Sequence, residues 1–114
     1  MAGTELTTRF TEAQLARILD QSAVYICACP AQICQAISAQ RALHAYQAAC
    51  LNDTRQDTAV HQRIAEAAAR AHEELESCLH DVLTLEGWDL ATLTMPAHLA
   101  KRLADEFDQG CGMP

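Results

Sequence analysis

The sequence has few aromatic side chains and little positive charge. Aromatic residues make up only 4% of the chain, so Leu, Ile, Val and Ala must fill its core. Lys and Arg number 8 against 15 Asp and Glu, which gives a formal net charge of −7. Because a negative field repels phosphate backbones and anionic lipid, we expect neither nucleic acid nor a membrane as a partner.

Long apolar runs, glycine-rich loops and catalytic motifs are also missing from the sequence. No run reaches the length of about 18 apolar residues that a membrane span needs, and the N-terminal residues do not resemble a signal peptide. We therefore expect a cytoplasmic protein whose cysteines stay reduced. The sequence contains neither a phosphate-binding glycine motif nor G-x-S-x-G, so no enzyme class is indicated.

The spacing of the apolar residues predicts an all-α fold, a four-helix bundle with short loops. A chain of 114 residues is long enough for one core, which predicts a single helical domain, 1–114. The predicted helices and the flexible tail after them cover 11–26, 30–51, 55–86, 96–109 and 111–114.

Several residues mark the ends of these helices. Thr11 and Gln14 have the spacing of a capping box. Pro30 is typical of the first position of a helix, and Gly87 is typical of the residue that ends one. These signals favour a new helix at 30 and an end to the third helix near 86.

The predicted third helix is the longest, and its apolar residues continue over its whole length. Its predicted inner stripe consists of Val60, Ile64, Ala67, Ala71, Leu75, Cys78, Val82 and Leu85. The corresponding stripe of the second helix consists of Ile33, Ala36 or Ile37, Gln40, Leu43, Tyr46 or Gln47, and Cys50. At roughly 48 Å against roughly 30 Å, the third helix extends beyond the second. The extra apolar length predicts a homodimer or a protein partner through the third helix.

Three of the six cysteines, Cys27, Cys29 and Cys34, lie at the junction of the first two predicted helices. Cys29 would occupy the cap of the second helix, where backbone N–H groups and the positive end of the helix dipole stabilise a thiolate. Three thiolates at one helix end predict a metal site, with Cys50 or Cys78 as a fourth ligand. Soft thiolate ligands favour Zn, Cu(I) or an iron–sulfur cluster.

The spacing of these cysteines leaves other interpretations open. C-x-C followed by C-x4-C matches neither the paired spacing of structural zinc sites nor the usual iron–sulfur runs. Each cysteine also fits ordinary packing, above all Cys50 and Cys78. The sequence therefore supports three hypotheses: binding of a soft metal ion or cluster, a protein–protein interaction or dimerisation module, and a thiol redox enzyme with Cys29 as its reactive thiolate.

A second candidate set lies on the predicted third helix, where His72, Glu76 and His80 follow one another at intervals of four residues. Residues at this interval share one face of a helix, and such a face suits a divalent ion when ligands from other helices converge on it. Glu73 and Glu74 lie beside this set. The pattern therefore favours a solvated acidic face over a metal site.

Overall fold

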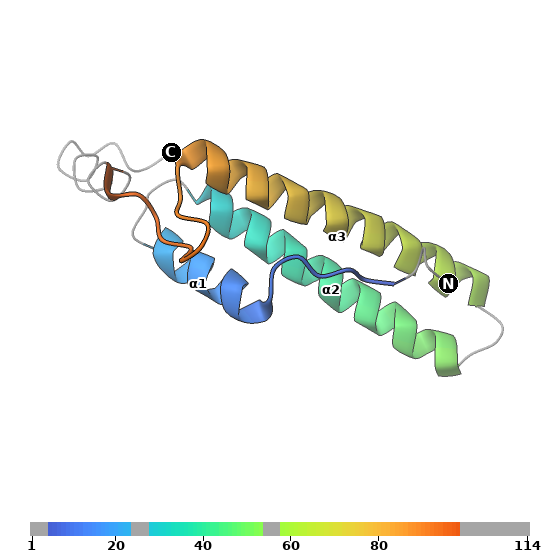
Figure 1. The fold of residues 1–114 in the computed structure, drawn as a ribbon. Coiled ribbons are helices and arrows are strands. Elements are labelled where there is room, and N and C mark those ends of the chain that lie inside the picture. The colour runs from blue at the N-terminus through green and yellow to red at the C-terminus, as the bar shows by residue number, and fades with distance from the viewer. Residues whose placement is uncertain (1–4, 24–27, 54–57, 99–114) are drawn as a thin grey trace. The chain divides into compact units, whose positions relative to one another are not determined.

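The computed structural model describes residues 5–23, 28–53 and 58–98, and over these residues it has three helices and no strand. Helix α1 spans Glu12–Ser22, α2 spans Cys29–Asp53 and α3 spans Thr58–Glu86 (Figure 1). The all-α prediction is confirmed, and α3 is the longest helix, with 29 residues against 25 in α2. No described part of these helices is both long and apolar enough to cross a membrane.

The prediction of a four-helix bundle is wrong. Gly87 ends α3 in the left-handed conformation, with φ of 85°, and the chain then forms a tight turn. In this turn Asp89 and Thr94 form an isolated antiparallel bridge. The turn buries Trp88, Leu93 and Met95, so side chains outside any helix complete the core at the end of α3. Most of the predicted fourth helix, residues 99–109, and the predicted tail lie outside the described residues.

The chain divides into two compact units. The first unit joins Met1–Arg9 to Gln35–Cys78, and the second joins Phe10–Cys34 to Leu79–Pro114. The assignment of one domain to 1–114 stays a prediction.

The second unit has an apolar core. Its buried residues come from the residue before the α1 cap, from α1, from the start of α2, from the end of α3 and from the turn after α3: Phe10, Leu15, Ile18, Ser22, Pro30, Cys34, Leu79, Leu83, Trp88, Leu93 and Met95. The capping box of α1 is confirmed, because the Gln14 N–H donates to Thr11 Oγ1 at 3.0 Å and the Thr11 N–H donates to Gln14 Oε1 at 2.8 Å. Two side chains of α1 also bind the turn. Arg17 donates to Thr94 Oγ1 at 3.1 Å, and Gln21 accepts the Met95 N–H at 2.9 Å.

The first unit has a small and partly polar core. Within it α2 and α3 lie side by side, and the segment before α1 runs along them (Figure 1). Its buried residues are Ile37, Gln47, Ala65, Ala68, His72 and Glu76. Three of these six side chains are polar, which sets this core apart from that of the second unit.

The predicted inner stripes of the two long helices are wrong in part. In α3, Val60 is 55% exposed and Leu85 is 85% exposed, while His72 and Glu76 are buried. In α2, Leu43 and Tyr46 are exposed. The solvated acidic face predicted for His72 and Glu76 is therefore also wrong. Apolar spacing misled both assignments, because the buried stripe of α3 contains these two polar residues.

Candidate functional site

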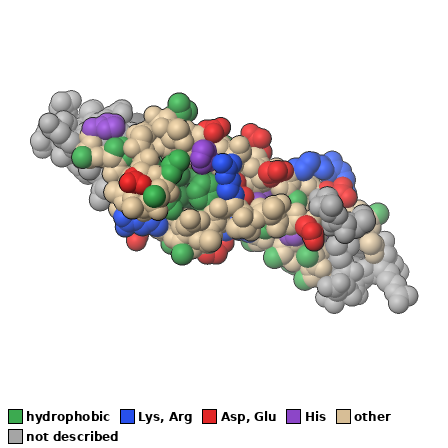
Figure 2. Space-filling view, viewed as in Figure 1, with side chains coloured by type: hydrophobic (Ala, Val, Ile, Leu, Met, Phe, Trp, Pro, Cys, Tyr) green, Lys and Arg blue, Asp and Glu red, His purple; other side chains and the backbone are tan. Residues whose placement is uncertain are grey.

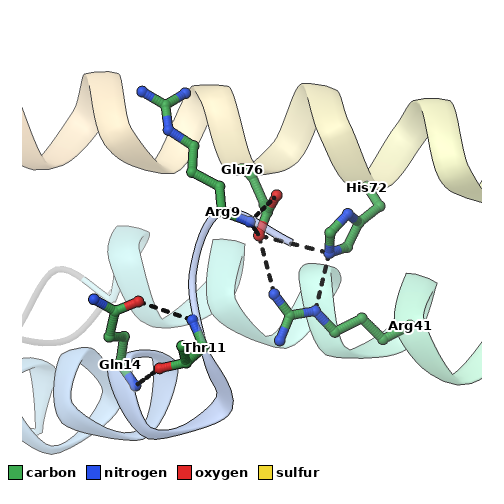
Figure 3. A network of polar contacts seen from close by, with 6 residues as sticks. All are labelled: Arg9, Thr11, Gln14, Arg41, His72 and Glu76. Carbon is green, nitrogen blue, oxygen red and sulfur yellow. Dashed lines mark hydrogen bonds and ion pairs between the residues drawn. The ribbon is translucent and has the colours of Figure 1, made fainter. Parts of the chain in front are cut away.

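The buried carboxylate of Glu76 connects three segments of the first unit. Its side chain comes from α3, and the residue is 3% exposed. The backbone N–H of Arg9 donates to both carboxylate oxygens, at 3.0 Å to Oε1 and 2.9 Å to Oε2. Arg41 of α2 donates from Nη2 to Oε2 at 3.0 Å. Glu76 therefore ties both α2 and the segment before α1 to α3 (Figure 3).

His72 lies one turn before Glu76 on α3 and completes this cluster. Arg41 Nε donates to His72 Nε2 at 2.9 Å, and the same imidazole nitrogen lies 3.7 Å from Glu76 Oε2. A guanidinium can only donate, so Nε2 must accept and the neutral ring carries its proton on Nδ1. Nδ1 is buried and has no hydrogen-bond partner among the described residues. We refer to Arg9, Arg41, His72 and Glu76 as the Glu76 network.

The surroundings of His72 favour its neutral form. Burial lowers the pKa of His72 below its ordinary value of 6.5. The charges of Arg41 and His44 lower this pKa further, whereas the charge of Glu76 opposes them. His72 is therefore uncharged at pH 7 and can accept the Arg41 N–H.

A cleft of about 750 Å³ lies beside the Glu76 network in the first unit. It is lined by residues 7–9 and by side chains of α3 between Arg70 and Ser77, including Glu73, Glu74 and Glu76. Charges of both signs therefore face this cleft. They indicate no single class of ligand.

The structure tests only part of the predicted cysteine site, because Cys27 lies outside the described residues. Cys29 is exposed and is the first residue of α2, but Ala28 holds the cap position, since its carbonyl accepts the Gln32 N–H at 2.8 Å. Cys34 is fully buried, and this burial raises the pKa of its thiol to about 11. Its thiol is therefore protonated at neutral pH, which does not favour the predicted group of thiolates.

The two cysteines predicted as a fourth ligand, Cys50 and Cys78, are half-buried. Over the ranges that the structure describes, no group of three or more His, Cys, Asp or Glu side chains is placed to hold a metal ion. A zinc, Cu(I) or iron–sulfur site that includes Cys27 stays a prediction.

The exposed side of α2 in the first unit differs from that of α3 in charge. Its exposed residues are Gln35, Ser38, Ala39, Ala42, Leu43, Ala45, Tyr46 and Ala49, which we call the α2 outer face. None of them is charged. Exposed residues of α3 include Arg63, Arg70, Glu73, Glu74 and Asp81. Figure 2 shows acidic side chains gathered over α3.

Sequence reasoning named His72 and Glu76 but missed their partner, Arg41. One signal was available: Arg41 is the only charged residue of α2 before Asp53. A single cation in a long helix, four residues after the core residue Ile37, indicates a charge that faces inward and needs a buried anion.

Compared with known proteins, the chain matches no family model, no curated protein and no solved structure. Its function must therefore be inferred from its own residues.

Proposed function

We propose that this chain is a protein–protein interaction module that associates with a second copy of itself through the α2 outer face. One observation carries the proposal: eight exposed positions of α2 lack charge in a chain whose net charge is −7. An ordinary surface helix carries charged residues on the side that faces solvent, and the α2 outer face lacks them. Leu43 and Tyr46, which are 39% and 64% exposed, lie on this face.

The spacing of the α2 outer face also supports helix pairing. Gln35, Ala39, Ala42, Tyr46 and Ala49 follow one another at intervals of four, three, four and three residues, as in the contact line of a coiled coil. Alanine at three of these positions allows a second helix to approach closely. The proposal replaces the contact through the third helix that the sequence predicts, because a contact there would have to bury exposed charged side chains of α3 such as Arg63, Arg70 and Glu73.

A second copy is the partner that matches this face best. In an antiparallel pair related by a twofold axis near Ala42, Tyr46 of one copy lies opposite Ala39 of the other, a large side chain against a small one. A parallel pair would place Tyr46 against Tyr46. The line from Gln35 to Ala49 is about 22 Å long, so each copy buries a few hundred Å², well below the roughly 800 Å² of a standard interface. We therefore expect weak, reversible dimers.

Sedimentation velocity over a range of protein concentrations tests the proposal. The wild type should sediment as a monomer–dimer equilibrium, and Ala42→Glu should remain monomeric because it places a charge at the centre of the contact. Ala67→Glu is the matched control, since Ala67 is an exposed alanine of α3. A wild type that stays monomeric at the highest concentration, or equal dimerisation of both variants, would contradict the proposal.

A further inference from the structure

The Glu76 network contains two side chains that compete for one acceptor. Glu76 Oε2 lies 3.0 Å from Arg41 Nη2 and 3.7 Å from His72 Nε2. Arg41 comes from α2, whereas His72 comes from α3 like Glu76 itself. The choice between these two side chains therefore decides whether the Glu76 carboxylate forms an ion pair with α2 or with another residue of α3.

We propose that the Glu76 network is a proton-operated switch, in which protonation of His72 transfers Glu76 from Arg41 to His72 and breaks the ion pair that joins α2 to α3 in the first unit. This inference is independent of the proposed self-association. It assigns to His72 a role that a purely structural buried histidine would not have.

The switch follows from the hydrogen-bond chemistry of imidazole. In the neutral state Nε2 accepts the N–H of Arg41 Nε at 2.9 Å, and this bond holds the guanidinium beside Glu76. A proton taken from solvent binds to Nε2, which can then only donate. The bond from Arg41 Nε is lost, and two cations face each other at hydrogen-bond distance.

After protonation, both the His72 imidazole and the Arg41 guanidinium have a new position available. His72 and Glu76 are four residues apart on α3, so a small rotation brings the protonated Nε2 to Oε2 as a charge-assisted donor. The side chain of Arg41 is already 13% exposed and has water within reach, whereas that of His72 is fully buried. Arg41 is therefore the cation that leaves.

Some of the groups that face His72 oppose its protonation and one favours it. Arg41 and His44 of α2 oppose its protonation, and Glu76 of α3 favours it. The backbone N–H of Arg9, from the segment before α1, stays bonded to Glu76 in both states. Removal of His44 should therefore make the switch respond at a higher pH.

Nuclear magnetic resonance of the full chain tests the switch. The Arg41 Nε–H signal, identified by its absence in Arg41→Lys, is followed between pH 7.5 and pH 5 together with the ring nitrogens of His72. We expect a protected Arg41 N–H at high pH whose exchange with water becomes about tenfold faster, or more, as His72 titrates. The circular dichroism of the helices should stay unchanged over the same range.

Two variants separate the switch from a structural role. His72→Gln can still accept from Arg41 but cannot titrate, so its Arg41 signal should not change with pH. His44→Gln keeps the whole network, so it should shift the transition to higher pH even if His72→Gln fails to fold. The proposal is overturned if the Arg41 N–H stays protected while His72 titrates, if its loss coincides with loss of helix, or if His44→Gln leaves the transition unmoved.

Discussion

At the scale of single residues, the unusual feature is a charged group in the core of the first unit. Glu76 satisfies its buried carboxylate with the Arg9 N–H and the Arg41 guanidinium. Buried ion pairs contribute little net stability, because desolvation offsets their attraction, but loss of one member leaves an unpaired charge in the core. We therefore expect the Glu76 network to specify which segments meet more than it stabilises the unit.

Replacement of one member of this pair should be much worse than replacement of both. Glu76→Met removes the acceptor of the Arg41 Nη2 and Arg9 N–H bonds and should lower the free energy of unfolding by about 3 kcal/mol. The double variant Arg41→Met and Glu76→Met should lose less, because it also removes the guanidinium that faces this carboxylate. Urea denaturation monitored by circular dichroism measures both, and a double variant less stable than Glu76→Met would contradict this account.

The neutral state of His72 should make stability depend on pH. Its pKa in the folded chain is lower than 6.5, so the unfolded chain binds more protons as the pH falls through 6.5. The stabilisation is thus fully present above pH 6.5 and declines below it. Urea midpoints between pH 7.5 and pH 5.5 should fall for the wild type and fall less for His72→Gln; equal slopes would exclude His72 as the source.

At the scale of elements, local signals set where the helices start and end. Gly87 ends α3 with a left-handed conformation, and the Trp88 N–H returns to the Leu83 carbonyl at 2.9 Å. The capping box at the start of α1 is equally local. Such signals are readable in the sequence because each depends on residues only a few positions apart.

The contribution of one such signal, the Thr11 cap of α1, to the free energy of unfolding can be measured directly. Thr11→Ala removes the acceptor for the Gln14 N–H and should lower the free energy of unfolding by about 1 kcal/mol. Thr11→Ser keeps a hydroxyl at the same position and should lose much less. Residue 11 is exposed, so changes in packing do not complicate the comparison of the two variants. Urea denaturation measures both free energies of unfolding. Equal losses in the two variants would show that the Thr11 hydroxyl does not stabilise the helix.

Which side of each long helix faces inward could not be read from apolar spacing alone. The buried positions of α3 recur at intervals of three and four, but His72 and Glu76 occupy two of them. A search for apolar residues skips His72 and Glu76 and selects other residues of α3, such as Val60 and Leu85, which are exposed. The two polar residues of this stripe are bound by Arg41, which belongs to another helix and is 31 residues away from His72.

At the scale of the whole molecule, charge controls how two copies can meet. With a net charge of −7, two copies repel each other, and the uncharged α2 outer face is where contact adds no further repulsion. Salt shortens the reach of this repulsion without weakening apolar contact.

The proposed dimer should therefore strengthen with salt. Raising NaCl from about 0.05 M to about 0.5 M should lower the dissociation constant measured by sedimentation, because screening removes repulsion between acidic copies. Association through ion pairs would weaken over the same range. Dimers that dissociate at high salt would place the contact on the charged side of α3 and not on the α2 outer face.

The sequence by itself determined the helical class, the capping box of α1, the end of α3 at Gly87 and the greater length of α3, because these depend on neighbours along the chain. Only the tertiary structure decided that a turn covers α1, that Cys34 is buried, and that Arg41 meets His72 and Glu76. Those features depend on contacts between segments that are distant in the sequence, where one buried charge requires another. The spacing of apolar residues along one helix does not identify such partners on another helix.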